Sequence, residues 1–191
     1  MINKIIVLGH TGFIGRNIFK TLKKKSKYNK NLIVKGISTK IIDLSKNSSI
    51  NKLKKEITDR STIVICSVIK PRSGDVLELF DKKILEKNKK MITNVVKAIK
   101  IKKPKKIIYL SSNAVYGVYK NHRKISEKAK IIADTFYGKS KYLFEKRLKS
   151  VLEKKLIIVR PAIVYGFDEK FVSNNPSGFI KLIKSRNTIS L

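Results

Sequence analysis

The 191-residue sequence predicts an α/β fold in which helices cover both faces of a parallel β-sheet, in a doubly wound arrangement. Two observations predict this fold. Short apolar runs of strand length alternate with longer stretches whose apolar residues recur at helical spacing. The short runs are also apolar throughout, which is typical of parallel strands buried on both faces. Right-handed crossovers between such strands give the doubly wound form.

The predicted strands are short and largely apolar, and they cover residues 4–8, 32–37, 41–44, 62–66, 106–110 and 156–160. The predicted helices are longer and amphipathic, and they cover residues 13–25, 49–58, 75–101, 134–153 and 178–185. The predicted loops cover residues 71–75, 117–127 and 168–178. The last loop contains Asn174-Asn175-Pro176-Ser177-Gly178, which is a turn signal.

A glycine-rich turn follows the first predicted strand. Gly9, Gly12 and Gly15 are each separated by two residues, and the chain runs on into a helix whose apolar face begins at Ile14. Glycines let the backbone turn sharply and approach a ligand, and the free N–H groups at a helix start face an anion. A strand, this turn and a helix together predict a site for the pyrophosphate of a dinucleotide.

A second group of candidate residues follows the strand predicted at 106–110. Ser112 lies in the turn after this strand, and Tyr137 and Lys141 open a later helix. Their four-residue spacing places Tyr137 and Lys141 on one helix face. Because a nearby ammonium favours the phenolate, we expect Lys141 to lower the pKa of Tyr137. Such a tyrosine can exchange a proton with an alcohol or carbonyl while a hydride moves to or from a nicotinamide.

The residues expected to meet the adenosine ribose follow the strand predicted at 32–37. A carboxylate about 20 residues beyond the last glycine would bind the ribose of NAD. The sequence instead has Ser38, Thr39 and Lys40 at this place. Hydroxyls and an ammonium suit a 2′-phosphate, so the sequence slightly favours NADP over NAD.

The composition is that of a globular protein with a very basic surface. The chain is 42% hydrophobic and carries a formal net charge of +32. Of its 45 basic residues, 38 are lysine and 7 are arginine, and they are spread along the chain. Proteins usually recognise phosphates and bases with arginine, which is scarce here. We therefore interpret the net charge as that of a solvated surface whose lysines reflect an AT-biased genome. This surface also attracts anionic nucleotides. Weak polyanion attraction and dedicated nucleic-acid binding are the less favoured alternatives.

Several common features are missing from the sequence. Cys66 is the single cysteine, which fits a reducing compartment, and the two histidines, His10 and His122, lie too far apart to predict a zinc site. The first apolar run is too short for a signal peptide and leads into the glycine turn. No apolar run approaches the roughly 20 residues that span a bilayer. We therefore expect a cytoplasmic protein with neither a metal site nor a membrane partner.

Together these motifs resemble the extended short-chain dehydrogenase/reductase superfamily, in its NAD-dependent epimerase/dehydratase branch, which acts on nucleotide-sugars. The motifs follow the family's order over nearly the whole chain and imply a Rossmann-like fold. They are Gly9-x-x-Gly12-x-x-Gly15, Ser111-Ser112-Asn113-Ala114-Val115-Tyr116-Gly117, Tyr137-x-x-x-Lys141 and Arg160-Pro161-Ala162-Ile163-Val164-Tyr165-Gly166. Asn88 also resembles the family's helix asparagine, and Asp43-Leu44 resembles its adenine-contacting pair.

The resemblance implies a role for each of these residues. Tyr137 would be the catalytic acid/base, and Ser112 would bind the reacting oxygen. Lys141 would lower the pKa of Tyr137 and hold the nicotinamide ribose, while Asn113 would contact the substrate. The residues implied to bind the cofactor are Gly9, Thr11, Gly12, Phe13, Ile14, Gly15, Ser38, Lys40, Asp43, Leu44, Asn88, Tyr137, Lys141 and Pro161.

The implied reaction is epimerisation or keto-reduction of a nucleotide-sugar in the synthesis of surface polysaccharide. Relatives that remove water from a hexose carry Asp-Glu after the Ser/Thr, where this sequence has Asn113 and Ala114, so dehydration is disfavoured. Family members continue well beyond Arg160-Pro161. We therefore expect a dinucleotide-binding domain over residues 1–170 and only the start of a substrate-binding region over 171–191.

Such a short chain has an alternative interpretation. It could be a catalytically impaired dinucleotide-binding module that acts as a sensor or scaffold, or a fragment of a longer enzyme. The resemblance further implies a homodimer.

Overall fold

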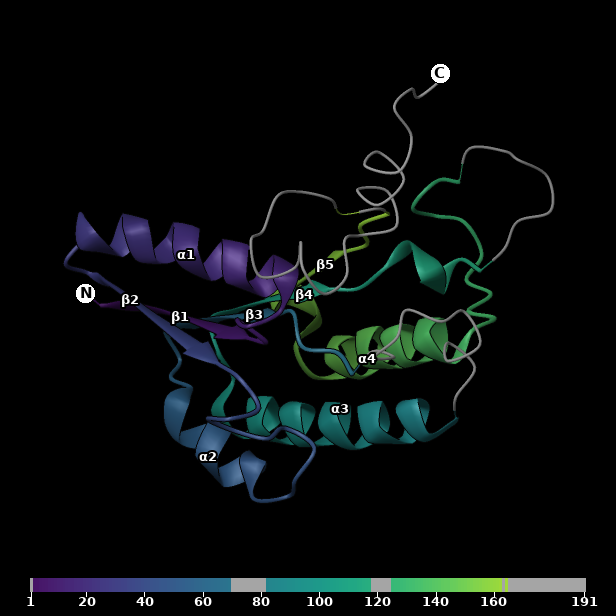
Figure 1. Ribbon diagram of the computed structural model, residues 1–191, viewed down its shortest axis with the longest axis horizontal. Helices are drawn as coiled ribbons and strands as arrows, with labels where there is room; N and C mark the ends of the chain where they lie inside the picture. The colour runs from purple at the N-terminus through teal and green to yellow at the C-terminus, as the bar shows by residue number, and fades with distance from the viewer. Residues whose placement is uncertain (1, 70–81, 118–124, 163, 165–191) are drawn as a thin grey trace, which may run out of the picture.

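The computed structural model describes residues 2–69, 82–117, 125–162 and 164. Within them, five parallel strands form one sheet with helices on both faces (Figure 1), so the predicted fold class is confirmed. The strands are β1 (Asn3–Leu8), β2 (Leu32–Ile37), β3 (Ser61–Ile65), β4 (Lys106–Leu110) and β5 (Leu156–Val159). The helices are α1 (Phe13–Lys27), α2 (Ser49–Glu56), α3 (Lys82–Lys102) and α4 (Phe136–Leu152), with short 3₁₀ turns η2 (Asn113–Val115) and η3 (Glu153–Lys155).

The strand order creates a place for a ligand. The order is β2-β1-β3-β4-β5, so β1 pairs with β2 on one side and with β3 on the other. The chain therefore leaves β1 towards one edge of the sheet and later returns past it towards the opposite edge. In open parallel sheets, ligands bind beyond the carboxyl ends of the strands at such a switch point.

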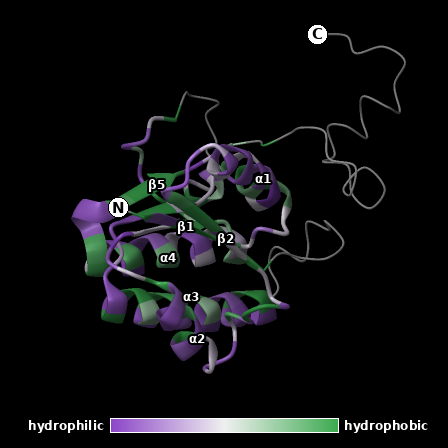
Figure 2. Cartoon of the chain, turned by 90° about the vertical axis from the view of Figure 1, so that its left-hand side faces the viewer, coloured by the Kyte–Doolittle hydropathy of each residue, from purple (hydrophilic) through white to green (hydrophobic). Residues whose placement is uncertain are grey.

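Two layers of helix enclose the sheet. Helix α1 covers one face over β1 and β2, and α2, α3 and α4 cover the other face (Figure 1). Ile14, Ile18 and Leu22 of α1 are partly buried, whereas Asn17 and Lys20 between them are exposed. This single apolar face is the one predicted from the spacing. Figure 2 shows hydrophilic residues over much of α1 and hydrophobic residues along the strands.

The main core lies between the sheet and the layer of α2, α3 and α4. Ile6, Ile63 and Ile107, from three neighbouring strands, are fully buried there with Val95 of α3 and Phe144 of α4. Full burial of an apolar side chain of this size contributes roughly 1.5–3 kcal/mol. The packing fixes the ends of the strands, and with them the loops that form the site.

The prediction of a strand over 41–44 is wrong. The Ile42 N–H donates to the Ser38 carbonyl at 2.9 Å, and the Asp43 carboxylate accepts an N–H two residues further on at 3.0 Å. These are turn contacts. Ile42 and Leu44 are buried at 6% and 7% exposure, but they cover the core as part of the turn. Their two-residue spacing, which a strand shares, misled the prediction.

The other predicted elements agree with the structure to within a few residues where the structure describes them. The strand predicted at 62–66 spans Ser61–Ile65, and the helix predicted from 75 is described from Lys82. The predicted loops at 71–75 and 168–178, the predicted helix at 178–185 and the region at 171–191 lie outside the described residues, as do residues 118–124 of the loop predicted at 117–127. Within the described part of the chain, no helix has the length and apolar character needed to cross a membrane.

Glu56 ties the end of α2 to the sheet. Its carboxylate accepts hydrogen bonds from the ammonium groups of Lys4 at 3.1 Å and Lys35 at 2.7 Å. Burial opposes its ionisation, but the two hydrogen bonds outweigh burial and hold the pKa of Glu56 below the ordinary 4.5. Because this pKa is lower in the folded protein, the ionised carboxylate stabilises the fold above pH 4.5. That stabilisation is lost as the pH falls through the folded pKa.

We predict that Glu56→Gln lowers the free energy of unfolding at neutral pH and that its difference from wild type vanishes at acid pH. Urea unfolding curves over a range of pH measure this difference. Glu153→Gln, at an exposed position, is the control and should show little difference at any pH. A constant difference between Glu56→Gln and wild type at every pH would contradict the assignment.

Candidate functional site

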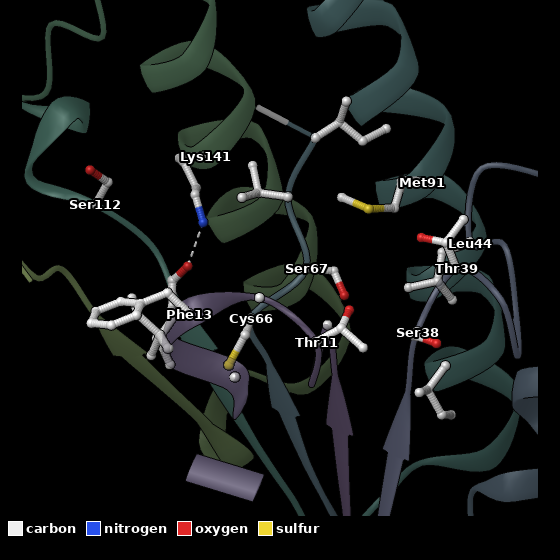
Figure 3. Close-up of a pocket in the computed structure, with 18 of the residues that line it drawn as sticks. Thr11, Phe13, Ser38, Thr39, Leu44, Cys66, Ser67, Met91, Ser112 and Lys141 are labelled. Atoms are coloured by element: carbon white, nitrogen blue, oxygen red, sulfur yellow. Dashed lines mark hydrogen bonds between the residues drawn. The ribbon is translucent and has the colours of Figure 1, made fainter. Parts of the chain in front are cut away.

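A cleft of about 910 Å³ lies at the switch point, beyond the ends of the strands (Figure 3). Its floor is the turn between β1 and α1. Gly9 has φ of +80°, and a Cβ there would lie 2.9 Å from the backbone nitrogen of Ser67. A Cβ on Gly15 would lie 2.2 Å from the carbonyl oxygen of Gly9. Neither position has room for a side chain, so the backbone of the turn is what a ligand meets.

The features around this turn fit an anion. Gly12 is the N-cap of α1, so no side chain caps the helix, and its first turn holds no acidic residue. The positive end of the helix dipole therefore faces the cleft. At the exit of β3, the buried hydroxyl of Ser67 finds no hydrogen-bond partner among the described residues. A bound pyrophosphate or ribose would supply the acceptor or donor that this hydroxyl lacks, so the residues present fit a dinucleotide.

One end of the cleft lies at the exit of β2. Ser38 and Thr39 line it there, together with Leu44 and with Met91 of α3 (Figure 3). Lys40, which was predicted to bind the cofactor, is exposed and does not line the cleft. The turn that begins at Ser38 carries it outwards.

Asp43 lines the same end of the cleft. Its carboxylate accepts the Ser45 hydroxyl at 2.6 Å and the Ser45 N–H at 3.0 Å. These hydrogen bonds hold the pKa of Asp43 below its ordinary value. The side chain therefore fixes the turn locally and stays ionised at neutral pH.

Two buried asparagines of α3 hold the two rims of the cleft. The Asn94 amide donates to the carbonyls of Leu44 at 3.0 Å and Lys46 at 3.1 Å. The Asn88 side chain accepts the Ile69 N–H at 3.0 Å and donates to the Ile69 carbonyl at 2.9 Å. Asn88 does not line the cleft. Its amide supports the loop after β3 through these backbone groups, and its contact with the cofactor stays a prediction.

The other end of the cleft lies between α4 and the exit of β4. Thr135 caps α4 by accepting the Gly138 N–H at 2.9 Å. A Cβ on Gly138 would lie 2.4 Å from the Ala114 carbonyl oxygen, so the first turn of α4 packs directly on η2. This close approach brings Tyr137 of α4 to Ser112, the residue just before η2.

Lys141 lies one turn after Tyr137 and is 4% exposed. Its ammonium donates to the Leu110 carbonyl at 2.6 Å, the dashed line in Figure 3, and lies 5.8 Å from the centre of the Tyr137 ring. The predicted pairing of Tyr137 and Lys141 on one helix face is therefore present.

The predicted lowering of the Tyr137 pKa is wrong for the free protein. Burial raises the pKa of Tyr137 above the ordinary 10.0, and a hydrogen bond with the Ser112 hydroxyl only partly opposes this rise. Burial dominates because removing the phenol from water penalises the phenolate. At neutral pH the phenol is therefore protonated and can donate a proton.

Asn113, the predicted substrate contact, does not line this cleft. Its side chain is exposed and its N–H donates to the Pro161 carbonyl at 3.0 Å. It lies instead beside a second hollow of about 680 Å³ along β5, which Arg160 also lines. Its amide oxygen accepts the hydroxyl of the neighbouring Ser112 at 3.4 Å.

The cleft brings together most of the residues predicted from the sequence. They are Gly9, Thr11, Gly12, Phe13, Ile14, Gly15, Ser38, Asp43, Leu44, Ser112, Tyr137, Lys141 and Pro161. Sequence reasoning missed Cys66, Ser67 and Met91, which also line the cleft. The position of Cys66 and Ser67, directly after a predicted strand, is the signal that could have identified them. Burial raises the pKa of Cys66 to about 11.

Comparison with known families places the chain. The model of the NAD-dependent epimerase/dehydratase family matches residues 5–191. The chain belongs to this family. No curated protein matches the sequence of this epimerase/dehydratase family member. Its described residues contain no cluster of three or more His, Cys, Asp or Glu side chains that could hold a metal ion.

Solved structures resemble this family member in fold at low sequence identity. A dTDP-4-dehydrorhamnose reductase from Clostridium acetobutylicum is 24% identical with a TM-score of 0.71, and the match covers 97% of this chain and 61% of that one. A GDP-D-glycero-L-gluco-heptose synthase from Campylobacter jejuni, solved in the presence of NADPH, is 20% identical with a TM-score of 0.66, over 86% and 48%. A UDP-glucose 4-epimerase from Thermus thermophilus, in complex with NAD, is 17% identical with a TM-score of 0.66, over 82% and 54%. The chain thus spans about half to three fifths of these relatives.

The variant Ser67→Ala should separate stability from ligand affinity in this family member. Because its buried hydroxyl has no partner within the part of the chain that the structure describes, removing it should leave the free energy of unfolding unchanged or higher. The affinity for a nicotinamide dinucleotide should fall by about five- to tenfold, the value of one hydrogen bond of roughly 1 kcal/mol. Urea unfolding and fluorescence titration with NADPH measure the two effects.

Ser150→Ala, which removes an exposed hydroxyl on the opposite end of α4, is the control and should leave dinucleotide affinity unchanged. Loss of stability together with unchanged affinity in Ser67→Ala would show that the hydroxyl serves the fold instead of the ligand.

Proposed function

We propose that the chain binds a nicotinamide dinucleotide along the cleft. In this arrangement the pyrophosphate lies on the glycine turn, the adenosine lies beside Ser38 and Leu44, and the nicotinamide lies beside Tyr137. Three observations support it: the close backbone contacts at Gly9 and Gly15, the Ser67 hydroxyl that has no partner among the described residues, and membership of an NAD-dependent family. Figure 3 shows Ser112 and Lys141 at one end of the cleft and Ser38 and Leu44 at the other, with Thr11 of the turn between them.

We infer a modest preference for NADP over NAD. Ser38 and Thr39 line the cleft at the exit of β2, where a carboxylate would repel a 2′-phosphate. Lys40 follows them and is exposed, so its ammonium is free to reach an anion at the rim.

We predict that NADPH binds more tightly than NADH and that the ratio of affinities falls in Lys40→Ala. The charge attraction is screened by salt, so the ratio should also fall as ionic strength rises. Fluorescence titrations with both nucleotides measure it. Lys30→Ala, at another exposed lysine, controls for the general basic charge. Equal binding of the two nucleotides to wild type would remove the preference.

We further propose that the chain transfers a hydride to or from a nucleotide-sugar. The observation that carries this proposal is the pairing of Ser112 and Tyr137 beside Lys141 at one end of the cleft. The chemistry that a bound nicotinamide supplies is hydride exchange with a ring carbon of the sugar. The residues of the chain would handle the oxygen and the proton on that carbon.

Each of the three side chains has a distinct task in this mechanism. The Ser112 hydroxyl would hold the substrate oxygen, and the Tyr137 phenol would give this oxygen a proton in reduction or take one from it in oxidation. The Lys141 ammonium would stabilise the phenolate that is left after proton donation. Because a tyrosine phenol is protonated at neutral pH, the free protein already holds the proton that keto-reduction requires. Epimerisation needs both directions and remains the second candidate.

We predict that Tyr137→Phe reduces hydride exchange with a nucleotide-sugar by at least about a hundredfold, which is the usual contribution of general acid catalysis. Dinucleotide affinity should change little, since the aromatic ring is kept. Keto-reduction is measured as NADPH oxidation with a panel of nucleotide-4-keto-sugars. Epimerisation is measured as isotope exchange into UDP-hexoses. Tyr142→Phe, on the same helix but away from the cleft lining, is the control.

A non-catalytic outcome has its own signature. The chain matches only 48–61% of the length of the solved relatives named above. If wild type binds NADPH yet turns over no nucleotide-sugar, the chain acts as a dinucleotide-binding module. Unchanged turnover in Tyr137→Phe would remove Tyr137 from its proposed role.

The homodimer, the cytoplasmic location and the part in polysaccharide synthesis stay predictions from the family resemblance.

A further inference from the structure

A buried carboxylate lies directly behind the Ser112–Tyr137 pair. Glu145 follows Lys141 by one helical turn of α4 and is 1% exposed. Its oxygen Oε1 accepts the Ser111 hydroxyl at 2.5 Å. Tyr137, Lys141 and Glu145 therefore stand in one row along the helix, and each binds a different residue where the chain leaves β4.

These three contacts fix consecutive positions of the chain. Lys141 holds the carbonyl of Leu110, Glu145 holds the side chain of Ser111, and Tyr137 meets the hydroxyl of Ser112. A shift of α4 by one residue would break all three contacts together.

Arg160 completes the arrangement from the neighbouring strand. Its Nε donates to Oε1 of Glu145 at 2.9 Å, and its Nη2 donates to Oε2 at 2.7 Å, which is a bidentate ion pair. Its remaining nitrogen Nη1 donates to the Tyr116 hydroxyl at 2.8 Å. Glu145 raises the pKa of Arg160, so the guanidinium stays charged.

The ion pair therefore holds both ends of the turn that carries Ser112. Glu145 binds Ser111, which comes just before it, and Arg160 binds Tyr116, which comes four residues after it. Neither Glu145 nor Arg160 lines the dinucleotide cleft, so neither would touch the cofactor.

We propose that the Glu145–Arg160 ion pair is a positioning device that sets the Ser112 hydroxyl against the Tyr137 phenol. The inference rests on the proposed function for its catalytic meaning, because that function assigns the proton transfer to these two groups. An ion pair suits this task better than apolar packing. Its fork geometry specifies direction as well as distance, and its hydrogen bonds to Ser111 and Tyr116 are lost if the turn rotates.

The side chain at 160 also fits this task by its chemistry. The chain has 38 lysines and only 7 arginines, so arginine is the less common basic residue in this sequence. A lysine ammonium is a compact point charge that could not bind both carboxylate oxygens and the Tyr116 hydroxyl in one plane. A backbone carbonyl, such as that of Leu110 to which Lys141 donates, needs no such fork.

The test observes Tyr137 directly by NMR in the 191-residue chain, without bound ligand, at neutral pH. The chain is labelled with ¹³C at tyrosine Cζ, and the Tyr137 resonance is assigned by its loss in Tyr137→Phe. The chemical shift of this resonance reports the hydrogen bonding of the Tyr137 hydroxyl. Ser112→Ala should move this resonance, because it removes the partner. Glu145→Gln should move the Tyr137 resonance in the same direction. When Glu145→Gln is added to Ser112→Ala, the resonance should move no further than in Ser112→Ala alone.

Controls separate positioning from stability and from charge. Glu86→Gln breaks an exposed ion pair with Lys89 on α3 and should leave the Tyr137 resonance unchanged. Arg160→Lys keeps the charge but loses the fork, so it should move the resonance as Glu145→Gln does. It also supplies the readout should Glu145→Gln fail to fold.

Three outcomes would overturn the inference. One is a Glu145→Gln protein that melts at a lower temperature while its Tyr137 resonance stays in place, since the pair would then serve stability alone. Another is an equal movement of the resonance with and without Ser112, since the effect would then come from charge. The third is no movement in Ser112→Ala itself. Failure of the proposed function would show separately, as absent NADPH binding or turnover in wild type.

Discussion

The contact between the start of α1 and the end of β1 is the constraint on which the site depends. Gly15 lies so close to the Gly9 carbonyl that no side chain fits, and Gly9 lies as close to the backbone of Ser67. These two contacts hold α1, β1 and the exit of β3 together without any side chain between them. Hydrogen bonds from Gly9 to Ile37 and from Cys66 to Leu8 extend the ladder to the very ends of the strands. Backbone is thereby exposed to a ligand at the one place where three strand exits converge.

The end of the cleft at α4 is organised by buried charges, together with the close packing of Gly138 on η2. Lys141 and Glu145 are both almost fully buried, and each is satisfied by groups at the exit of β4 or β5. In a medium of low polarity such contacts are strong and an unpaired partner is costly. Helix α4 is therefore fixed relative to the sheet in direction as well as in distance. The cleft therefore has a floor shaped by close backbone contacts at glycines and an end shaped by polar side chains that cannot move independently.

The sequence predicted those parts of the site that depend on the spacing of residues close together in the chain. Gly9, Gly12 and Gly15 reveal a strand, turn and helix within a dozen residues, and Tyr137 and Lys141 share a helix face because four residues make one turn. The parallel sheet followed in the same way from apolar runs between amphipathic stretches. For these features, knowledge of the tertiary contacts added little.

The parts that the sequence missed depend on neighbours distant along the chain. The role of Ser67 requires that β3 lie beside β1, and that of Asn88 depends on a loop 19 residues earlier. The direction of the Tyr137 pKa depends on how deeply the phenol is buried, which spacing does not state. The turn at 41–44 shows the converse error, since an apolar spacing of two residues serves a covering turn as well as a strand.

The raised pKa of Cys66 has a practical consequence for experiments. Its thiol, with a pKa of about 11, is almost wholly protonated at neutral pH, and alkylating reagents react with the thiolate. A cysteine introduced at an exposed position, such as Lys20 on the outer side of α1, would therefore react much faster with a maleimide. Fluorophores or spin labels can then be attached to chosen surface positions while the native thiol in the cleft stays unmodified.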